Sequence, residues 1–220
     1  MTDKSADDVN RAYWDKVFSK PHTIADTSSH WIGELLAQNP LPLPGDILEI
    51  GCGSGYDTAF LLAHGCTMTC MDLSWNALRR VTQTYPAATL VHAALPDPLP
   101  FRSNVFDFVV CGLSLHYYRW DDTRRAVAEV RRVLSEDGVL IFQVNATEDV
   151  EHGAGQGEEI EPGLFLNRGR YKRFFSEQMC RELFADGWHL DLLVPRLETH
   201  FNTNKRTWAG ICRPARAKMD

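Results

Sequence analysis

The sequence lacks the features that nucleic-acid-binding and membrane proteins share. Its 220 residues include 23 Lys and Arg against 29 Asp and Glu, which gives a formal net charge of −6 at pH 7. An acidic chain is a poor electrostatic match for the phosphate backbone, so we expect no nucleic-acid partner. No apolar run is long enough to cross a bilayer, and the polar first residues contain no signal-peptide core. We therefore expect a cytoplasmic protein that makes no contact with a membrane.

The cysteines lack the spacing of metal sites. None of the six cysteines belongs to a C-x-x-C pair, and most stand in apolar, strand-like or helical surroundings. His64, Cys66 and Cys70 lie near one another in the sequence, but a structural zinc site needs a fourth ligand, which is missing there. We therefore expect buried free thiols of a reduced compartment and no bound metal.

The chain has one dense basic cluster and no sign of a second domain. At 220 residues it is long enough to bury a sizeable core, but too short for a catalytic domain plus a large recognition domain. The cluster consists of Arg168, Arg170, Lys172 and Arg173. Short runs of this kind are most often solvated loops, and we interpret this one in that way. We expect a monomer or a homodimer.

The stretch Asp46 to Thr58, which reads DILEIGCGSGYDT, combines a strand, a glycine turn and the start of a helix. Residues 47–50 have strand character, and Gly51, Gly53 and Gly55 follow them. Glycine adopts backbone conformations that are closed to other residues, and it lets a ligand approach without a Cβ in the way. The following helix would direct free N–H groups and a partial positive charge at a ligand over the turn.

The glycine spacing excludes two common nucleotide motifs. A dinucleotide fingerprint requires G-x-G-x-x-G, but Tyr56 stands where its third glycine belongs, and the G-K-[ST] of a phosphate loop is also missing. The remaining pattern, acidic-x-Gly-x-Gly-x-Gly after a first strand, resembles motif I of the class I S-adenosylmethionine (SAM) dependent methyltransferases. The resemblance implies SAM as cofactor. It implies contacts to SAM from Glu49, Gly51, Cys52, Gly53, Gly55 and Cys111.

An acidic residue ends the second expected strand. Asp72 follows the strand-like run Thr67–Met71, roughly twenty residues past the glycine turn, where crossover units of this kind grip ribose hydroxyls. We therefore expect Asp72 to bind the ribose, with helix capping as its alternative role. Ser74 is the better candidate for the cap of the next helix. Leu73 would lie against the adenine.

The residues after the third expected strand depart from the family pattern. Many relatives place an Asp there that accepts a hydrogen bond from the adenine amino group, whereas this chain has Ala93, Ala94 and Leu95. Backbone groups of Ala94 and Leu95 are the favoured replacement, and Asp97 is the alternative.

A loop that contains several side chains with polar end groups follows the fourth expected strand, Phe106–Gly112. Open α/β sheets bind ligands at this carboxyl edge. His116, with Tyr117 beside it, is therefore a candidate general base or substrate orienter, and the alternative is that His116 only packs. The [DN]-P-P-[YF] run of many enzymes that methylate nucleic-acid bases is replaced by Cys111–Ser114, which argues against DNA bases as acceptors.

The alternation of strands and helices predicts an α/β fold with a parallel sheet. Helices are expected near residues 9–18, 29–38, 57–64, 76–85, 121–134 and 176–185, and strands near 47–50, 67–71, 89–94, 106–112, 139–144, 189–197 and 206–212. Asp137 and Gly138 are expected to end the helix that begins at Asp121. The resemblance implies a three-layer Rossmann-like, seven-stranded sheet with an antiparallel edge strand. The expected single domain, 1–220, comprises an N-terminal helical cap (1–45), a SAM-binding core (46–146), a substrate lid loop (147–175) and a C-terminal helix with strands (176–220).

The expected lid is rich in glycine and charge and has no regular period. Loops of this length in compact domains are usually functional or disordered, and the aromatic content of residues 164–175 favours an ordered lid. Its candidates for the substrate wall are Phe165, Arg170, Tyr171 and Phe174. In the methyltransferases that this sequence resembles, an N-terminal helix with a Tyr-Trp pair often covers the cofactor, so Tyr13 and Trp14 are further candidates, with simple packing as the alternative.

These features together predict a methyltransferase that transfers a methyl group from SAM to a small-molecule acceptor and releases S-adenosylhomocysteine. Methyl transfer from a sulfonium is an in-line displacement, so positioning supplies most of the acceleration. A base is needed only when the acceptor arrives protonated. The alternatives are a non-catalytic SAM-binding protein or, within the enzyme class, a thiol or chalcogen methyltransferase, since the chain also weakly resembles the tellurite-resistance type.

Overall fold

A computed structural model describes residues 6–20, 30–200 and 203–215 of the chain. The α-helices are α1 (Ala6–Phe18), α2 (Trp31–Gln38), α3 (Tyr56–Ala63), α4 (Trp75–Thr84), α5 (Trp120–Val133) and α6 (Glu177–Leu183). The strands are β1 (Asp46–Ile50), β2 (Thr67–Asp72), β3 (Thr89–His92), β4 (Phe106–Gly112), β5 (Leu134–Asn145), β6 (Glu158–Glu161), β7 (Leu164–Asn167), β8 (Arg170–Arg173), β9 (Trp188–His200) and β10 (Thr203–Pro214). Two short 3₁₀ turns are η1 (Leu115–Tyr117) and η2 (Val150–His152).

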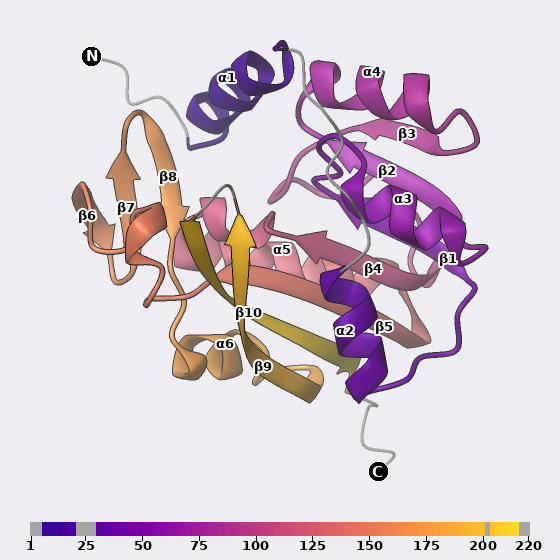
Figure 1. Cartoon of the computed structure of the whole chain (residues 1–220). Helices are drawn as coiled ribbons and strands as arrows, with labels where there is room; N and C mark the ends of the chain where they lie inside the picture. The colour runs from indigo at the N-terminus through magenta and orange to yellow at the C-terminus, as the bar shows by residue number, and fades with distance from the viewer. Residues whose placement is uncertain (1–5, 21–29, 201–202, 216–220) are drawn as a thin grey trace.

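A seven-stranded sheet forms the centre of the molecule, in the order β3-β2-β1-β4-β5-β10-β9 (Figure 1). Strands β1 to β5 pair in parallel. The antiparallel edge consists of the hairpin β9–β10, in which β10 pairs antiparallel with both β5 and β9. The predicted Rossmann-like fold is therefore confirmed.

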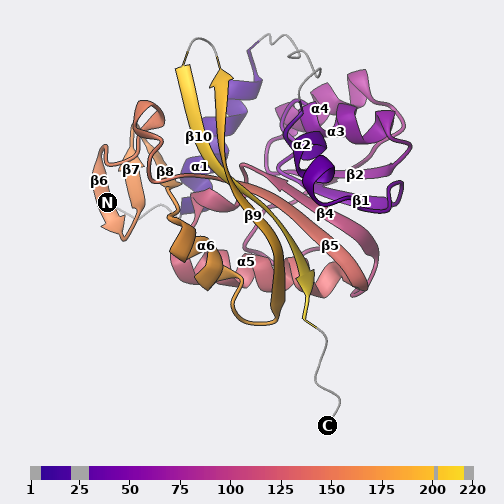
Figure 2. The ribbon, with the colours of Figure 1, turned by 60° about the horizontal axis from the view of Figure 1, so that its bottom comes forward.

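Helices cover both faces of the sheet, because the strands alternate their side chains between two cores. Leu48 of β1 packs with α5 and α6, whereas its neighbour Ile47 packs with α2, α3 and α4. Figure 2 shows α5 and α6 on one side of the sheet and α2 to α4 on the other. The carboxyl ends of the parallel strands all lie on the same side of the sheet. Residues of α1 and α2 line the cavity there.

Most elements lie within a few residues of their predicted ranges, α5 among them, but β5 begins at Leu134 rather than near residue 139. The predicted stop at Gly138 is wrong, because α5 ends at Val133 and β5 begins at Leu134. Leu134 is buried and pairs with Phe106 at the start of β4. Tertiary pairing thus ends the helix several residues before the glycine that serves as a local stop signal.

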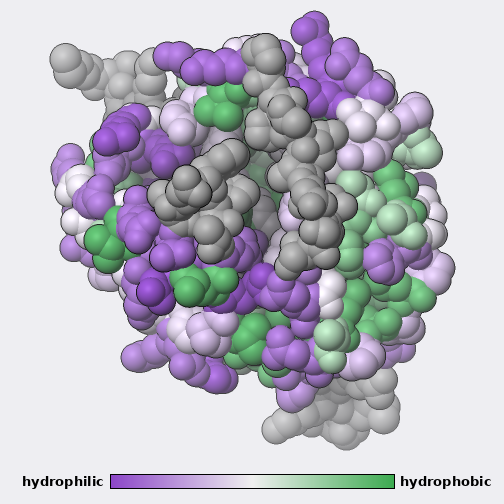
Figure 3. Space-filling view, in the orientation of Figure 1, coloured by the Kyte–Doolittle hydropathy of each residue, from purple (hydrophilic) through white to green (hydrophobic). Residues whose placement is uncertain are grey.

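The expected lid contains regular structure rather than an irregular loop. Strands β6, β7 and β8 form a three-stranded antiparallel sheet that follows β5. This small sheet lies beside α1 in Figures 1 and 2. Figure 3 shows mainly hydrophilic residues over it, at the left, and apolar residues at the right, over α3 and residues 39–45. These strands were not predicted because each has only four residues, which is too short to show a clear alternation of apolar and polar residues.

Several local predictions concern single side chains. All six cysteines are buried and free, as expected. Ser74 caps α4, since its Oγ accepts a hydrogen bond from the Ala77 N–H at 3.3 Å. Asp107 joins two neighbouring strands, because its carboxylate accepts from the Asp46 N–H at 2.9 Å. Among the described helices, none is long and apolar enough to cross a membrane.

Candidate active site

The glycine turn after β1 has the backbone conformation that the motif predicts. Gly51 and Gly53 have φ angles of 77° and 52°, in the left-handed region that favours glycine. A Cβ at Gly51 would lie 2.8 Å from the Cβ of Ser114, so the turn also passes too close to the loop after β4 for any other residue. The Gly51 N–H donates to the carbonyl of Met71 on β2 at 2.7 Å, which ties the turn to the neighbouring strand.

Asp72 lies at the carboxyl end of β2 and connects this strand with the glycine turn. Its carboxylate accepts hydrogen bonds from the Gly53 N–H at 2.9 Å and from the Ser74 N–H at 2.8 Å. The side chain is only 6% exposed, and burial raises its pKa to about 6. Each carboxylate oxygen retains a free lone pair, so Asp72 can still accept from ligand hydroxyl groups.

Glu49 is the acidic residue of the motif and is buried below the turn. The Thr58 hydroxyl donates to its carboxylate at 2.5 Å. Burial, and then the neighbouring Cys70, raise the pKa of Glu49 well above its usual value. A buried carboxyl group whose ionised form is disfavoured therefore lies below the glycine turn.

One cavity of about 540 Å³ extends along the carboxyl ends of β1, β2, β4 and β5. One end of it, the cofactor half, contains the glycine turn and the residues after β2 and β3. Its lining includes Glu49, Gly51, Cys52, Gly53, Met71, Asp72, Leu73, Ala94 and Leu95. The other end, the acceptor half, is lined by residues of η1, β5, η2, β8, β9 and β10. Its polar residues include His116, Tyr117, Gln143, Asn145, His152, Arg170, Lys172, Glu198 and Lys205.

Most of the predicted site residues line this cavity, but some do not. Trp14 lines it, while Tyr13 stands behind Arg170 and accepts a hydrogen bond from it at 3.0 Å. Ala94 and Leu95 line it and Asp97 does not. The residues that lie outside the lining are Gly55, Cys111, Phe165, Tyr171 and Phe174. Cys111 is instead fully buried in the core, and Gly55 begins α3 with a φ of 83°.

The strand alternation of β8 explains which lid residues reach the cavity. Arg170 and Lys172 share one face of this strand and line the cavity, whereas Tyr171 points to the opposite face. The interpretation of the basic cluster as a solvated loop is therefore wrong for most of its members. Lys172 is buried, and Arg173 is buried in an ion pair with Glu161.

His116 and Tyr117 lie at the cavity wall after β4, as their position predicted. His116 is 2% exposed, and burial together with the charges of Lys172, Lys205 and Arg170 lowers its pKa well below the usual value. His116 is consequently neutral at pH 7. Burial raises the pKa of Tyr117, which is therefore protonated at the same pH.

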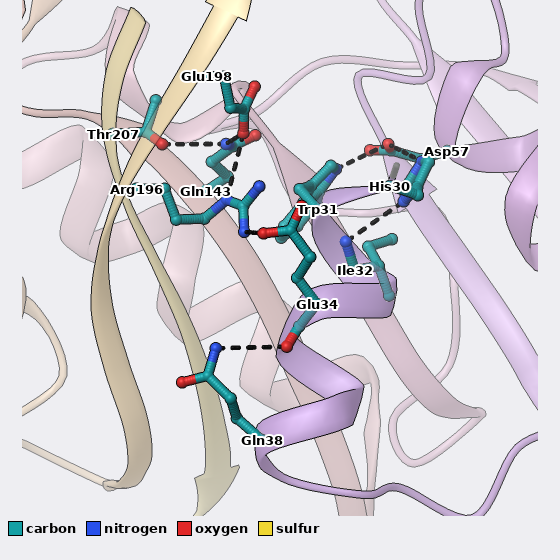
Figure 4. Close-up of polar contacts among 10 residues, drawn as sticks. All are labelled: His30, Trp31, Ile32, Glu34, Gln38, Asp57, Gln143, Arg196, Glu198 and Thr207. Atoms are coloured by element: carbon teal, nitrogen blue, oxygen red, sulfur yellow. Dashed lines mark hydrogen bonds and ion pairs between the residues drawn. The ribbon is translucent and has the colours of Figure 1, made fainter. Parts of the chain in front are cut away.

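Helix α2 closes the cavity opposite the small sheet. Trp31 donates from its indole nitrogen to Asp57 on α3 at 2.8 Å, and both residues line the cavity. Figure 4 shows His30 beside the same carboxylate, and Arg196 of β9 between Glu34 of α2 and Glu198. Polar contacts thus fasten α2 both to α3 and to the β9–β10 hairpin.

Sequence reasoning missed Lys172, Lys205 and Asn145. The position of Asn145 at the end of β5 was a usable signal, since ligands gather at the carboxyl ends of parallel strands. No signal was available for Lys205, because only the antiparallel return of β10 brings it back to the cavity.

The cofactor half fits a nucleoside-type ligand such as SAM. The positive φ values of Gly51 and Gly53 open the backbone to a ligand, and Asp72 offers carboxylate oxygens to ribose hydroxyls. Leu73, Leu95 and Met71 provide apolar surface of the kind that a purine base stacks on.

Three comparisons with known proteins agree with this geometry. Residues 48–142 match a family model described as a methyltransferase domain. The chain is 37% identical over 156 residues to a malonyl-[acyl-carrier protein] O-methyltransferase of Geobacter sulfurreducens, over 64% of this chain and 54% of that protein. It is 32% identical over 114 residues to the human mitochondrial arginine-hydroxylase NDUFAF5, over 50% of this chain and 32% of that protein.

Among solved structures, the 1,6-didemethyltoxoflavin-N1-methyltransferase of Burkholderia thailandensis, crystallised with 1,6-didemethyltoxoflavin and S-adenosylhomocysteine, superposes with a TM-score of 0.69. The identity is 20%, and the match covers 95% of this chain and 88% of that one, so it shows the fold. The chain spans about half or less of the curated relatives named above. Because one of those relatives is named a hydroxylase, similarity in this region does not by itself define the reaction.

Proposed function

We propose that this chain is a class I SAM-dependent methyltransferase, which transfers a methyl group from SAM to a small-molecule acceptor and releases S-adenosylhomocysteine. The observation that carries the proposal is that the glycine turn and Asp72 line the same cavity of about 540 Å³ as polar side chains of η1, β5, β8 and β10. A donor and an acceptor can therefore meet inside one cavity.

In this proposal the chain holds SAM through the residues of the cofactor half. The glycine turn receives the methionine portion, Asp72 accepts from the ribose hydroxyls, and backbone groups of Ala94 and Leu95 contact the adenine. When bound, SAM supplies a methyl carbon activated by its sulfonium.

The residues of the acceptor half position the nucleophile and exclude water. Holding two reactants in line removes most of the entropic cost of their encounter, and this can supply roughly 7 to 11 kcal/mol. The neutral His116 can accept a hydrogen bond from a protonated acceptor, but its lowered pKa makes it a weak base. The site is therefore better suited to an acceptor that arrives already deprotonated.

The first test measures SAM binding to the purified chain by calorimetry and compares it with NAD. SAM binding without NAD binding is the expected result, and NAD binding alone would replace the proposal with an oxidoreductase. The second test incubates the chain with SAM and a pool of acceptors that includes carboxylic acids, thiols, amines and phenols. Formation of S-adenosylhomocysteine is expected, whereas binding without turnover for every class would favour a non-catalytic SAM-binding protein.

A further inference from the structure

We propose that the acceptor half of the cavity is a binding site for an oxyanion, a carboxylate or a phosphoryl group, and that Arg170, Lys172 and Lys205 hold it. The inference rests on the proposed function, because it assigns this oxyanion to the methyl acceptor. It gives the acceptor a chemical class, namely a small molecule with a negatively charged oxygen group.

The three cations reach one cavity from two different sheets. Arg170 and Lys172 come from β8 of the small sheet, and Lys205 comes from β10 of the central sheet. Arg170 donates to the Tyr13 hydroxyl at 3.0 Å, and Lys172 donates to the His152 carbonyl at 2.9 Å. Among the described residues, neither Arg170 nor Lys172 forms an ion pair. Arg170 brings a positive charge to the cavity, and Lys172 adds a second one in its protonated form. The neutral oxygens solvate these charges but do not cancel them.

The carboxylates nearest to these cations already have other partners. Asp149 lies 3.4 Å from the Lys205 ammonium, but it also accepts from the Arg206 N–H at 3.0 Å and from His152 at 2.8 Å. Glu198 accepts from Gln143 at 2.6 Å and pairs with Arg196. The acceptor half therefore has more cations than available carboxylates.

Each cation raises the electrostatic cost of the others. Burial, and then the charges of Lys205 and Arg170, lower the pKa of Lys172 to about 7. Burial also lowers the pKa of Lys205, although Asp149 partly opposes the shift. An anion bound between these side chains would relieve this repulsion and favour their charged forms. The arrangement is unfavourable when empty and becomes favourable when a negative group fills it.

Two buried polar atoms in the same half lack partners. The Nδ1 of His116 and the Nδ2 of Asn145 form no hydrogen bond, although their residues are 2% and 0% exposed. Buried polar atoms are nearly always hydrogen-bonded, so an unpaired pair at one cavity wall indicates a ligand. The Asn145 Oδ1 accepts from Lys205 at 2.8 Å, which leaves its Nδ2 as a donor. The Asn145 Nδ2 can donate to an oxyanion, and the His116 Nδ1 can do so in the tautomer that carries its proton there.

Calorimetry with simple probes tests the site. The probes are acetate, its neutral analogue acetamide, and inorganic phosphate, each titrated at constant ionic strength into the chain with and without S-adenosylhomocysteine. Acetate or phosphate should bind and acetamide should not. Binding of acetate alone indicates a carboxylate site and binding of phosphate alone a phosphoryl site. Equal binding of acetate and acetamide, or no binding of either anion, overturns the inference.

Variants show whether the named cations form the site. Lys172→Met and Lys205→Met should each weaken binding of the anion roughly tenfold to a hundredfold, the range for one charged hydrogen bond. Lys172→Arg keeps the charge and should restore most of the affinity. The matched control is Arg124→Met, which removes an exposed cation of α5 that does not line the cavity.

The affinity for S-adenosylhomocysteine separates the two proposals. If it binds to all variants while the anion affinity does not depend on Lys172 or Lys205, the oxyanion site is wrong and the methyltransferase proposal stands. If S-adenosylhomocysteine and SAM do not bind but the anions do, with the expected loss in both Lys→Met variants, the methyltransferase proposal fails and the oxyanion site remains.

Discussion

The two halves of the cavity are built in opposite ways. The cofactor half consists mainly of two short segments that end β1 and β2, near residues 49–54 and 71–73, together with three residues after β3. The acceptor half consists of long charged side chains from β8 and β10 and of polar residues from η1 and β5. Its cations contrast with the carboxyl groups of Glu49 and Asp72 in the cofactor half.

This difference shows how one fold can retain its cofactor site while its acceptor site changes. A glycine turn between a strand and a helix is fixed by backbone geometry, so few sequences can form it. Long side chains on a small added sheet can change without disturbing the central sheet. The following predictions test whether the two halves are independent in this sense.

The largest effect is expected at the glycine turn. Gly53→Val places a β-branched residue at a φ of 52°, with the Phe18 ring 3.3 Å from the new Cβ. SAM binding should become undetectable by calorimetry because the turn must distort. Gly155→Val is the control, since Gly155 has a similar φ of 72° but no atom within 4 Å of the added Cβ. Circular dichroism should show both variants folded, and normal SAM affinity of Gly53→Val would contradict the assignment of the turn.

A smaller effect is expected at the end of β2. Asp72→Asn replaces the carboxylate that accepts hydrogen bonds from the ribose hydroxyls with a neutral amide. This change should weaken SAM binding by about 1 to 3 kcal/mol. Asp97→Asn is the matched control, because Asp97 does not line the cavity. Acetate binding in the acceptor half should remain unchanged in both variants. Unchanged SAM affinity of Asp72→Asn would leave Asp72 with a structural role only.

The halves should also respond to pH in opposite directions. Asp72 has a pKa raised to about 6 by burial, so its accepting, ionised form grows as pH rises through 6 and SAM affinity should increase. Lys172 has a pKa lowered to about 7, so its charge is lost as pH rises through 7 and anion affinity should fall. Calorimetry from pH 5 to 8.5 measures the affinities for SAM and for the anion. If both affinities changed with pH in the same direction, the two halves would not titrate as proposed.

Other titratable groups face the same two side chains. Near Asp72 these are Glu49, Asp15, Cys52 and Tyr117. Near Lys172 these are Arg170, Lys205, Asp149, His116 and His152. Lys172→Arg should remove the fall in anion affinity near pH 7, which assigns the titration to Lys172 rather than to a histidine.

The smallest effect is expected at His116. If the acceptor arrives as an oxyanion, no proton has to be removed, and His116→Gln should lower kcat by less than about tenfold, well below the 10²- to 10⁴-fold of a lost general base. SAM affinity should remain normal. Steady-state kinetics over pH 5 to 8.5 would show no new acid limb. A loss of about 10³-fold or more would instead assign a proton transfer to His116.

The resemblance of the sequence to methyltransferases predicted the central sheet, and local spacing predicted the glycine turn after β1. The spacing of Gly51, Gly53 and Asp72 reflects local rules, since a strand, a glycine turn and the next strand lie close together in the chain. The same is true of the cap at Ser74, whose partner lies three residues away. Local patterns of this kind need no knowledge of distant contacts.

Only the tertiary structure decided the acceptor half. Lys172 and Lys205 are 33 residues apart, and they meet because β8 folds over the cavity while β10 returns antiparallel beside β5. In the sequence, Arg170 and Lys172 belong to a basic run typical of a surface loop. The pairing of β8 with β7 turns alternate members of this run toward the cavity, and neither that pairing nor the resulting burial is encoded in neighbouring residues.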